Sequence, residues 1–146
     1  MKIIVKQENF ALNELKKLAE SCLSKYKLPV KKAIERAKRK DFTLLFAFNG
    51  KKRIGFIAGY AEKRKMHIWL FGVLKKNRGK GIGSKLLNRF HSISLKKDYK
   101  SVTTITFNKY KEKLILSLKH GYRITGLKHI HAKNDDTIFL EKVLKK

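Results

Sequence analysis

Hydrophobic residues follow two different periods along the chain, and each change of period marks an expected element. Residues 42–48 and 52–60 are short runs rich in apolar and aromatic residues, which predicts two strands. The Asn-Gly pair at 49–50 predicts a tight hairpin turn between them. In the second strand, Ile54 and Phe56 are expected to share one face.

The middle of the chain reads as strand, helix, strand. A nearly continuous apolar run at residues 67–74 predicts a strand covered on both faces. A helical stripe follows, made of Ile82, Leu86, Phe90 and Ile93. The β-branched run at 101–107 predicts the next strand. This order implies a right-handed parallel crossover, and ligands of such sheets bind beyond the carboxyl ends of the strands.

Weaker patterns before residue 42 predict an edge strand and two helices. The edge strand covers residues 2–6, and Asn9 is a candidate cap for the first helix. Pro29 stands at the expected start of the second helix. The stripe expected to be buried in that helix is Val30, Ala33, Ile34 and Ala37.

After residue 107 we expect one more helix and a closing hairpin. The helix covers residues 109–120 and ends at Gly121. Its inward side chains are expected to be Leu114, Ile115 and Leu118. Strands at 122–131 and 137–144 close the sheet, so the fold class is α/β on a mixed sheet, β-α-α-β-β-β-α-β-α-β-β.

Length and composition predict one domain, residues 1–146. The single cysteine, Cys22, excludes an intrachain disulfide and a cysteine-rich zinc site. The chain has neither an apolar signal-like start nor a run of 18 apolar residues, so we expect a cytoplasmic protein without a membrane partner. Monomer and dimer stay equally open.

The formal net charge of +26 is unusual. A field of that sign attracts RNA, acidic proteins and other polyanions, which makes a polyanion a candidate partner. Only seven of the 37 basic residues are Arg, the residue preferred for bidentate phosphate contacts. The lysines are spread over every predicted surface, so a purely compositional origin of the charge stays open beside a functional one.

Residues 78–85 combine three glycines with three cations at the expected start of a helix. Free N–H groups and the helix dipole make such a terminus suitable for a phosphate or pyrophosphate. Ser84 stands where both the Walker A loop and the dinucleotide fingerprint require glycine, so neither motif fits.

Val73, four residues, and then Arg78-Gly79-Lys80-Gly81-Ile82-Gly83 closely resembles the acyl-CoA-binding motif of the GNAT N-acetyltransferase superfamily. Arg78, Gly81 and Gly83 match its core, Arg/Gln-x-x-Gly-x-Gly/Ala. Asn108 and the Gly121-Tyr122 pair fit a second region of the family. The resemblance implies a mixed, mostly antiparallel sheet of six to seven strands, four helices and a splayed central parallel pair.

The resemblance also implies an enzyme that moves an acetyl group from acetyl-CoA to a primary amine by direct attack in a ternary complex. Backbone N–H groups near Val73 and Leu74 would polarise the thioester carbonyl, and Gly72 would ease a bulge there. The implied cofactor-binding residues are Phe71, Val73, Leu74, Arg78, Gly79, Lys80, Gly81, Ile82, Gly83, Ser84 and Asn108.

The catalytic side chains match the family less well. Many members carry a Tyr acid where this chain has Ser117, which could instead be an ordinary polar residue on an exposed helix face. His67 is the titratable residue of the central strand and is the first candidate base, with Glu62 more remote. His129 and His131 share a strand face, but no third ligand accompanies them, so we predict no metal.

Three functions remain open from the sequence. The first is an N-acetyltransferase acting on a primary amine of a small molecule, peptide or protein. The second is the same chemistry on an RNA-linked substrate, such as an aminoacylated RNA or a ribosomal protein, which the charge would favour. The third is a non-catalytic basic module that binds CoA or nucleic acid.

Overall fold

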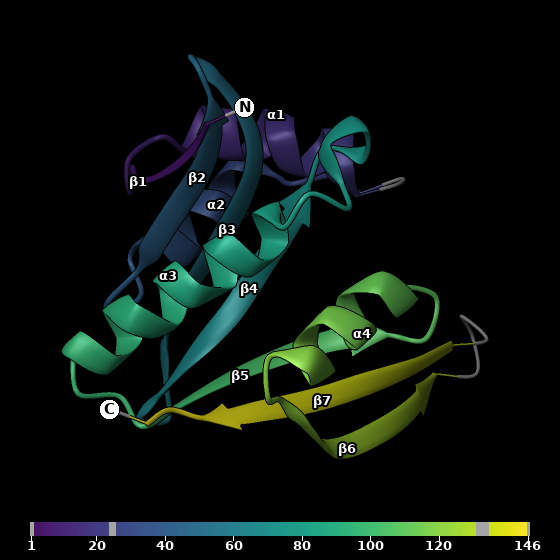
Figure 1. The fold of residues 1–146 in the computed structure, drawn as a ribbon. Coiled ribbons are helices and arrows are strands. Elements are labelled where there is room, and N and C mark those ends of the chain that lie inside the picture. Colours follow the sequence, from purple (N-terminus) through teal and green to yellow (C-terminus); the bar gives the residue numbers. More distant parts are fainter. Residues whose placement is uncertain (1, 24–25, 131–134, 146) are drawn as a thin grey trace.

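The computed structural model describes residues 2–23, 26–130 and 135–145. It forms one seven-stranded sheet in the order β1-β2-β3-β4-β5-β7-β6, with β4 and β5 parallel and the other neighbours antiparallel (Figure 1). The elements are β1 Ile3–Gln7, α1 Leu12–Cys22, α2 Val30–Ala37, β2 Thr43–Asn49, β3 Lys52–Glu62, β4 Lys65–Val73, the 3₁₀ turn η1 Lys75–Asn77, α3 Ile82–Lys96, β5 Ser101–Phe107, α4 Lys111–Lys119, β6 Arg123–Ile130 and β7 Asp135–Val143. The predicted fold class and element order are confirmed.

Helices cover both faces of the sheet (Figure 1). On one face, the stripe of α3 packs on β3 and β4 through Leu86 and Phe90, which are fully buried. On the other face, α1 buries Leu15 and Ala19 against β3 and β4. Burying such aliphatic and aromatic side chains typically stabilises a fold by about 1.5–3 kcal/mol each.

A β-bulge corrects the prediction for Ile54. The pairing jumps from Ala47–Gly55 to Phe48–Arg53, which leaves Ile54 as an extra residue in β3. Ile54 therefore lies in the α3-side core, while Phe56 lies in the α1-side core. The expectation that they share a face is wrong, because one added residue reverses the alternation.

Two other expectations about helix ends and faces are wrong. Asn9 does not cap α1: its side chain accepts a hydrogen bond from the Leu44 N–H at 2.9 Å and donates to the Phe42 carbonyl at 3.0 Å. The Asn9 amide thus extends the pairing of β1 with β2. In α2 only Ala33 of the predicted stripe is fully buried, and Val30 and Ile34 are exposed.

The inward face of α4 also differs from the prediction. Leu114 packs against the core, but Ile115 and Leu118 are exposed. Ser117 is the buried residue of the helix, at 2% exposure. Gly121 does end the helix with a left-handed backbone, as predicted. In the described part of the chain, no helix combines the length and apolarity needed to cross a bilayer.

Candidate active site

The glycine-rich loop ends in a left-handed backbone at the start of α3. Gly81 is the cap residue with φ +78°, and Gly79 has φ +77°. A Cβ built on either glycine meets no atom within 4 Å. Glycine is required here by the backbone angle, because a side chain would be strained at these angles. The space in front of the loop is therefore open to a ligand.

Unpaired N–H groups face that open space. The first intrahelical bond of α3 runs from the Lys85 N–H to the Gly81 carbonyl, so the N–H groups of Ile82, Gly83 and Ser84 precede the helical ladder. Lys80 and Lys85 are exposed beside them. Helix dipole, free donors and cations together make an anion site, as the sequence predicted.

Arg78 has a different position from the one expected of a phosphate ligand. Its Nε donates to the Val73 carbonyl at 3.0 Å, and its Nη2 donates to the Cys22 carbonyl at 3.1 Å. The side chain therefore ties the loop to the end of β4 and to the end of α1. Burial raises the pKa of the Cys22 thiol to about 11. No sequence pattern indicated that Cys22 adjoins this loop.

The third glycine of the loop serves packing. A Cβ on Gly83 would lie 3.0 Å from Leu116 Cδ2 and 3.4 Å from the ring of Phe71. Phe71 itself is core, at 9% exposure. Ser84 directs its hydroxyl to His120, with 2.9 Å between Oγ and Nε2. Gly83 and Ser84 thus hold α3 against α4, which fixes one wall of the site.

The parallel strands β4 and β5 part beyond three residue pairs. Met66, His67 and Ile68 pair with residues 102–104, and no later pair is formed between the two strands. We call the interval between β4 residues 69–73 and β5 residues 105–107 the interstrand gap. It begins beside Ile68 and widens toward the glycine loop, which follows β4 directly (Figure 1). The predicted splayed pair is present.

Backbone alternation directs the N–H groups of Val73 and, two residues earlier, Phe71 into this gap. The Leu74 N–H donates to the Ile54 carbonyl at 2.8 Å, so Leu74 belongs to a hydrogen-bonded pair with β3. In an antiparallel ladder the bonded positions alternate, so the preceding residue, Val73, turns its N–H and carbonyl away from β3 and toward the side of β5. The backbone N–H groups of Val73 and Leu74 were both expected to face the ligand. That expectation is wrong for Leu74, whose N–H is used by β3, and the Val73 N–H is still available.

The predicted bulge lies elsewhere in β4. Ala58 pairs with Leu70 and Gly59 with Ile68, which makes Trp69 the extra residue. Gly72 is in regular register, and a Cβ there would lie 3.2 Å from the Cβ of Cys22. Gly72 therefore allows α1 to pack closely on β4 and does not form the bulge.

Lys113, whose position was not predicted from the sequence, also lies at the interstrand gap. Its Nζ donates to the Ile105 carbonyl at 2.9 Å. The Leu144 N–H donates to the Lys100 carbonyl, so the same alternation turns the carbonyl of Ile105 away from β7 and toward β4. Lys113 thus places its amino group at the narrow end of the interstrand gap.

Burial lowers the pKa of Lys113 to about 8. The side chain is partly buried as a whole, and its charge also lowers the pKa of His67, so the two groups are electrostatic neighbours. A signal was present in the sequence: Lys113 is four residues before Ser117 and so lies on the same helix face.

The two predicted catalytic side chains lie at different depths. Ser117 is buried, so the alternative of an exposed polar residue is wrong; its carbonyl accepts the Tyr122 N–H at 3.0 Å. His67 lies in the paired part of β4, with Nδ1 2.9 Å from Thr103 Oγ1. Burial lowers the pKa of His67, and the charge of Glu62 opposes that shift.

Asn108 makes its contact with β7. Its Nδ2 donates to Asp136 Oδ2 at 2.8 Å, and Asp136 Oδ1 lies 2.6 Å from Nδ1 of His129. The side chain of Asn108 therefore orders the end of β5 in this structure. His131 lies outside the described residues. Within residues 2–23, 26–130 and 135–145, no three metal-binding side chains gather in one place.

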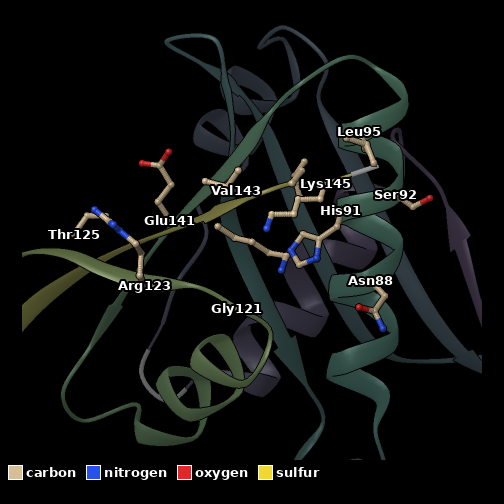
Figure 2. Close-up of a pocket in the computed structure, with 12 residues that line it drawn as sticks. Asn88, His91, Ser92, Leu95, Gly121, Arg123, Thr125, Glu141, Val143 and Lys145 are labelled. Carbon is tan, nitrogen blue, oxygen red and sulfur yellow. The ribbon is translucent and has the colours of Figure 1, made fainter.

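A separate cavity of about 990 Å³ lies between the second half of α3 and strands β6 and β7 (Figure 2). His91 borders it and contacts the Tyr122 hydroxyl at 2.6 Å. Burial is the main cause that lowers the pKa of His91 to about 4, with the charge of Lys142 adding to it. The cavity is at the far end of α3 from the glycine loop, so it is distinct from the interstrand gap.

The family follows from a match over more than half of the sequence. A model described as "Acetyltransferase (GNAT) domain" matches residues 40–124. The chain therefore belongs to the GNAT acetyltransferase family, as its motif indicated. No curated protein sequence is a significant match.

Solved structures show the same fold at low sequence identity. Ard1 from Thermoplasma volcanium has a TM-score of 0.87 at 17% identity, covering 100% of both chains. The ribosomal-protein-S18-alanine N-acetyltransferase from Escherichia coli has a TM-score of 0.86 at 10% identity, covering 99% of this chain and 96% of the other. A GNAT family acetyltransferase from Elizabethkingia anophelis with acetyl-CoA bound has a TM-score of 0.76 at 23% identity, covering 97% of this chain and 98% of the other.

Proposed function

We propose that this GNAT-family protein transfers the acetyl group of acetyl-CoA to a primary amine. One observation carries the proposal: an open anion site at the start of α3 adjoins a gap between two parallel strands, and the Val73 N–H is turned into that gap. A ligand with a pyrophosphate at one end and a carbonyl at the other fits this arrangement.

Each part of the chain has a distinct task in this proposal. The N–H groups of residues 82–84, with Lys80 and Lys85, bind the pyrophosphate. The Val73 N–H donates to the acyl oxygen as negative charge develops on it, and one such donor is typically worth about 3–4 kcal/mol in the transition state. Acetyl-CoA, when bound, supplies the activated acyl group.

Proton transfer is assigned to His67 and Ser117. His67 has a lowered pKa, so its imidazole is neutral at pH 7 and free to accept a proton. Ser117, on the buried face of α4, is the candidate hydrogen-bond donor toward the sulfur. A thiolate leaves readily at neutral pH, so a strong general acid is not essential.

Two observations bear on the acceptor. The E. coli enzyme of similar fold is named for an alanine of a ribosomal protein, which supports an amino group of a protein or peptide. The charge of +26 favours an acceptor within an RNA-bound particle or an acidic protein. An RNA-linked substrate is therefore the second candidate, and a cytoplasmic location suits both.

A thermal-shift titration with acetyl-CoA tests the proposal. A ligand at about a hundred times its Kd adds roughly 2.7 kcal/mol of stability, so we expect a saturable rise in Tm for the wild type. Gly81→Glu places a carboxylate at the anion site and should abolish the rise. Gly50→Glu is the matched control, because Gly50 also has a positive φ (+63°) and open space around its Cβ position.

The same proteins then enter an acceptor screen. Release of CoA in the presence of an amine, reduced in Gly81→Glu but not in Gly50→Glu, supports the transferase and excludes a non-catalytic module. A wild type that shows no shift at any acetyl-CoA concentration overturns the proposal.

A further inference from the structure

The amino group of Lys113 lies where an acceptor amine would have to be. The strands part after the Ile68–Thr104 pair, so the Ile105 carbonyl is the first in β5 beyond the narrow end of the gap. The 2.9 Å bond from Lys113 Nζ to that carbonyl fixes the amine there. Across the gap, Phe71 and Val73 both turn their N–H groups toward β5, with Phe71 nearer the narrow end and Val73 nearer the wide end.

The two ends of the gap determine which part of a ligand meets Lys113. The anion site of residues 79–84 lies at the wide end, after β4 has finished. A ligand whose pyrophosphate is held there can place only its distal, acyl end toward the narrow end. Lys113 is therefore opposite the reactive group of the ligand, and not opposite its charged end.

The environment of Lys113 favours an amine nucleophile. Burial lowers its pKa to about 8, so a much larger fraction of its amine is neutral at pH 7–8 than for a solvated lysine near 10.4. The other lysines of α4, Lys111 and Lys119, are exposed. Lys113 thus differs from its neighbours in both position and protonation.

We propose that Lys113 is a self-acetylation site, modified by the acetyl-CoA that the protein binds. The inference rests on the proposed function. The Lys113 ammonium first loses a proton to solvent. Its Nζ then forms a bond to the acyl carbon, the C–S bond breaks, the second proton leaves nitrogen, and CoA departs as a thiolate that takes up a proton. The product is a neutral amide, which removes one charge from the gap.

Site-resolved mass spectrometry tests this inference without any acceptor. Wild-type protein is incubated with acetyl-CoA and digested, and the occupancy of acetyl-lysine is compared at residues 111, 113 and 119. We expect Lys113 to exceed either neighbour at least tenfold, a preference lost in Gly81→Glu and in urea-unfolded protein. Lys113→Arg keeps the charge and should lack the modification while still showing the acetyl-CoA thermal shift.

Two negative outcomes are separable. If the wild type shows the thermal shift and acetylates a free amine but leaves Lys113 unmodified, the self-acetylation site is overturned and the proposed function stands. If the wild type shows no thermal shift, the proposed function fails first. Equal acetylation at all three lysines, unchanged in Gly81→Glu, also overturns the inference because it indicates solvent chemistry alone.

Discussion

The two halves of β4 have the same kind of sequence but different partners. From Met66 to Ile68 the strand is paired on both sides, with β3 and with β5. Beyond the bulge at Trp69, residues 70–73 keep their pairing with β3 but have no pairing with β5. In the first half the backbone groups are used by the two ladders, so only a side chain, that of His67, is available to the site. The second half carries the site, because its backbone groups on one side are left for a ligand.

This difference shows how the binding part of a site can arise from backbone groups. No carboxylate and no cysteine occurs in β4, and the donor that we assign to the acyl oxygen is the main-chain N–H of Val73. This binding part is created by the withdrawal of a neighbouring strand and not by a particular side chain. Substitutions at Val73 and at Gly59, each with a comparison variant, separate the two halves experimentally, and the expected effects decrease from the first to the last.

Val73→Pro removes an N–H that faces the gap and should have the largest effect. The ladder with β3 does not use that N–H, so proline is tolerated there as on an edge strand. We expect kcat to fall by about 10²–10³, equivalent to roughly 3–4 kcal/mol, with the acetyl-CoA thermal shift retained. Steady-state kinetics measure the fall in kcat, and the thermal-shift titration measures whether acetyl-CoA binding is retained.

Leu74→Pro is the matched control for that change. Its N–H donates to the Ile54 carbonyl, and its φ of −54° suits proline. We expect a loss of about 1 kcal/mol in unfolding free energy and a smaller loss of rate than in Val73→Pro. Equal rates in the two variants would remove Val73 from the mechanism.

Gly59→Ala tests the half of β4 that is paired on both sides, because Gly59 lies in β3 opposite Ile68. A Cβ there would lie 2.3 Å from the His67 carbonyl oxygen and 2.6 Å from the ring of Phe90. The strand must shift, so we expect unfolding to become easier by about 3 kcal/mol in urea titrations. Gly79→Ala, strained only in φ, should lose about 1–2 kcal/mol. If Gly79→Ala is the less stable of the two, the division between structural and open glycines is wrong.

Acid should weaken the fold through His91, and between pH 7 and 5 the effect is smaller than at Val73 or Gly59. Its pKa is about 4 when folded and near 6.5 when unfolded, so the unfolded chain binds more protons between these values. Stability is complete above about pH 7 and is lost as the pH falls, by about 2 kcal/mol between pH 7 and 5 and by about 3 kcal/mol at pH 4. His91→Gln should flatten the dependence of Tm on pH between 7 and 5. An unchanged slope would exclude His91 as its source.

The sequence predicts the order of elements and the position of the anion site, because both depend on local pattern. It does not predict contacts that join distant segments. Asn9 looks like a helix cap until β2 lies beside it, and Ile54 changes face because of one added residue. Lys113 lies on the helix face of Ser117, which the sequence indicates, but only the parting of β4 and β5 brings that face to the gap.

The position of Cys22 has a practical consequence for measuring the activity. It is the one cysteine of the chain, partly buried where Arg78 binds its carbonyl, and its thiol pKa is about 11. Thiols react as thiolates, so this group stays almost wholly unreactive at pH 7–8. A colorimetric disulfide reagent added to the reaction will therefore report the thiol of released CoA against a nearly silent protein background, with no cysteine replaced.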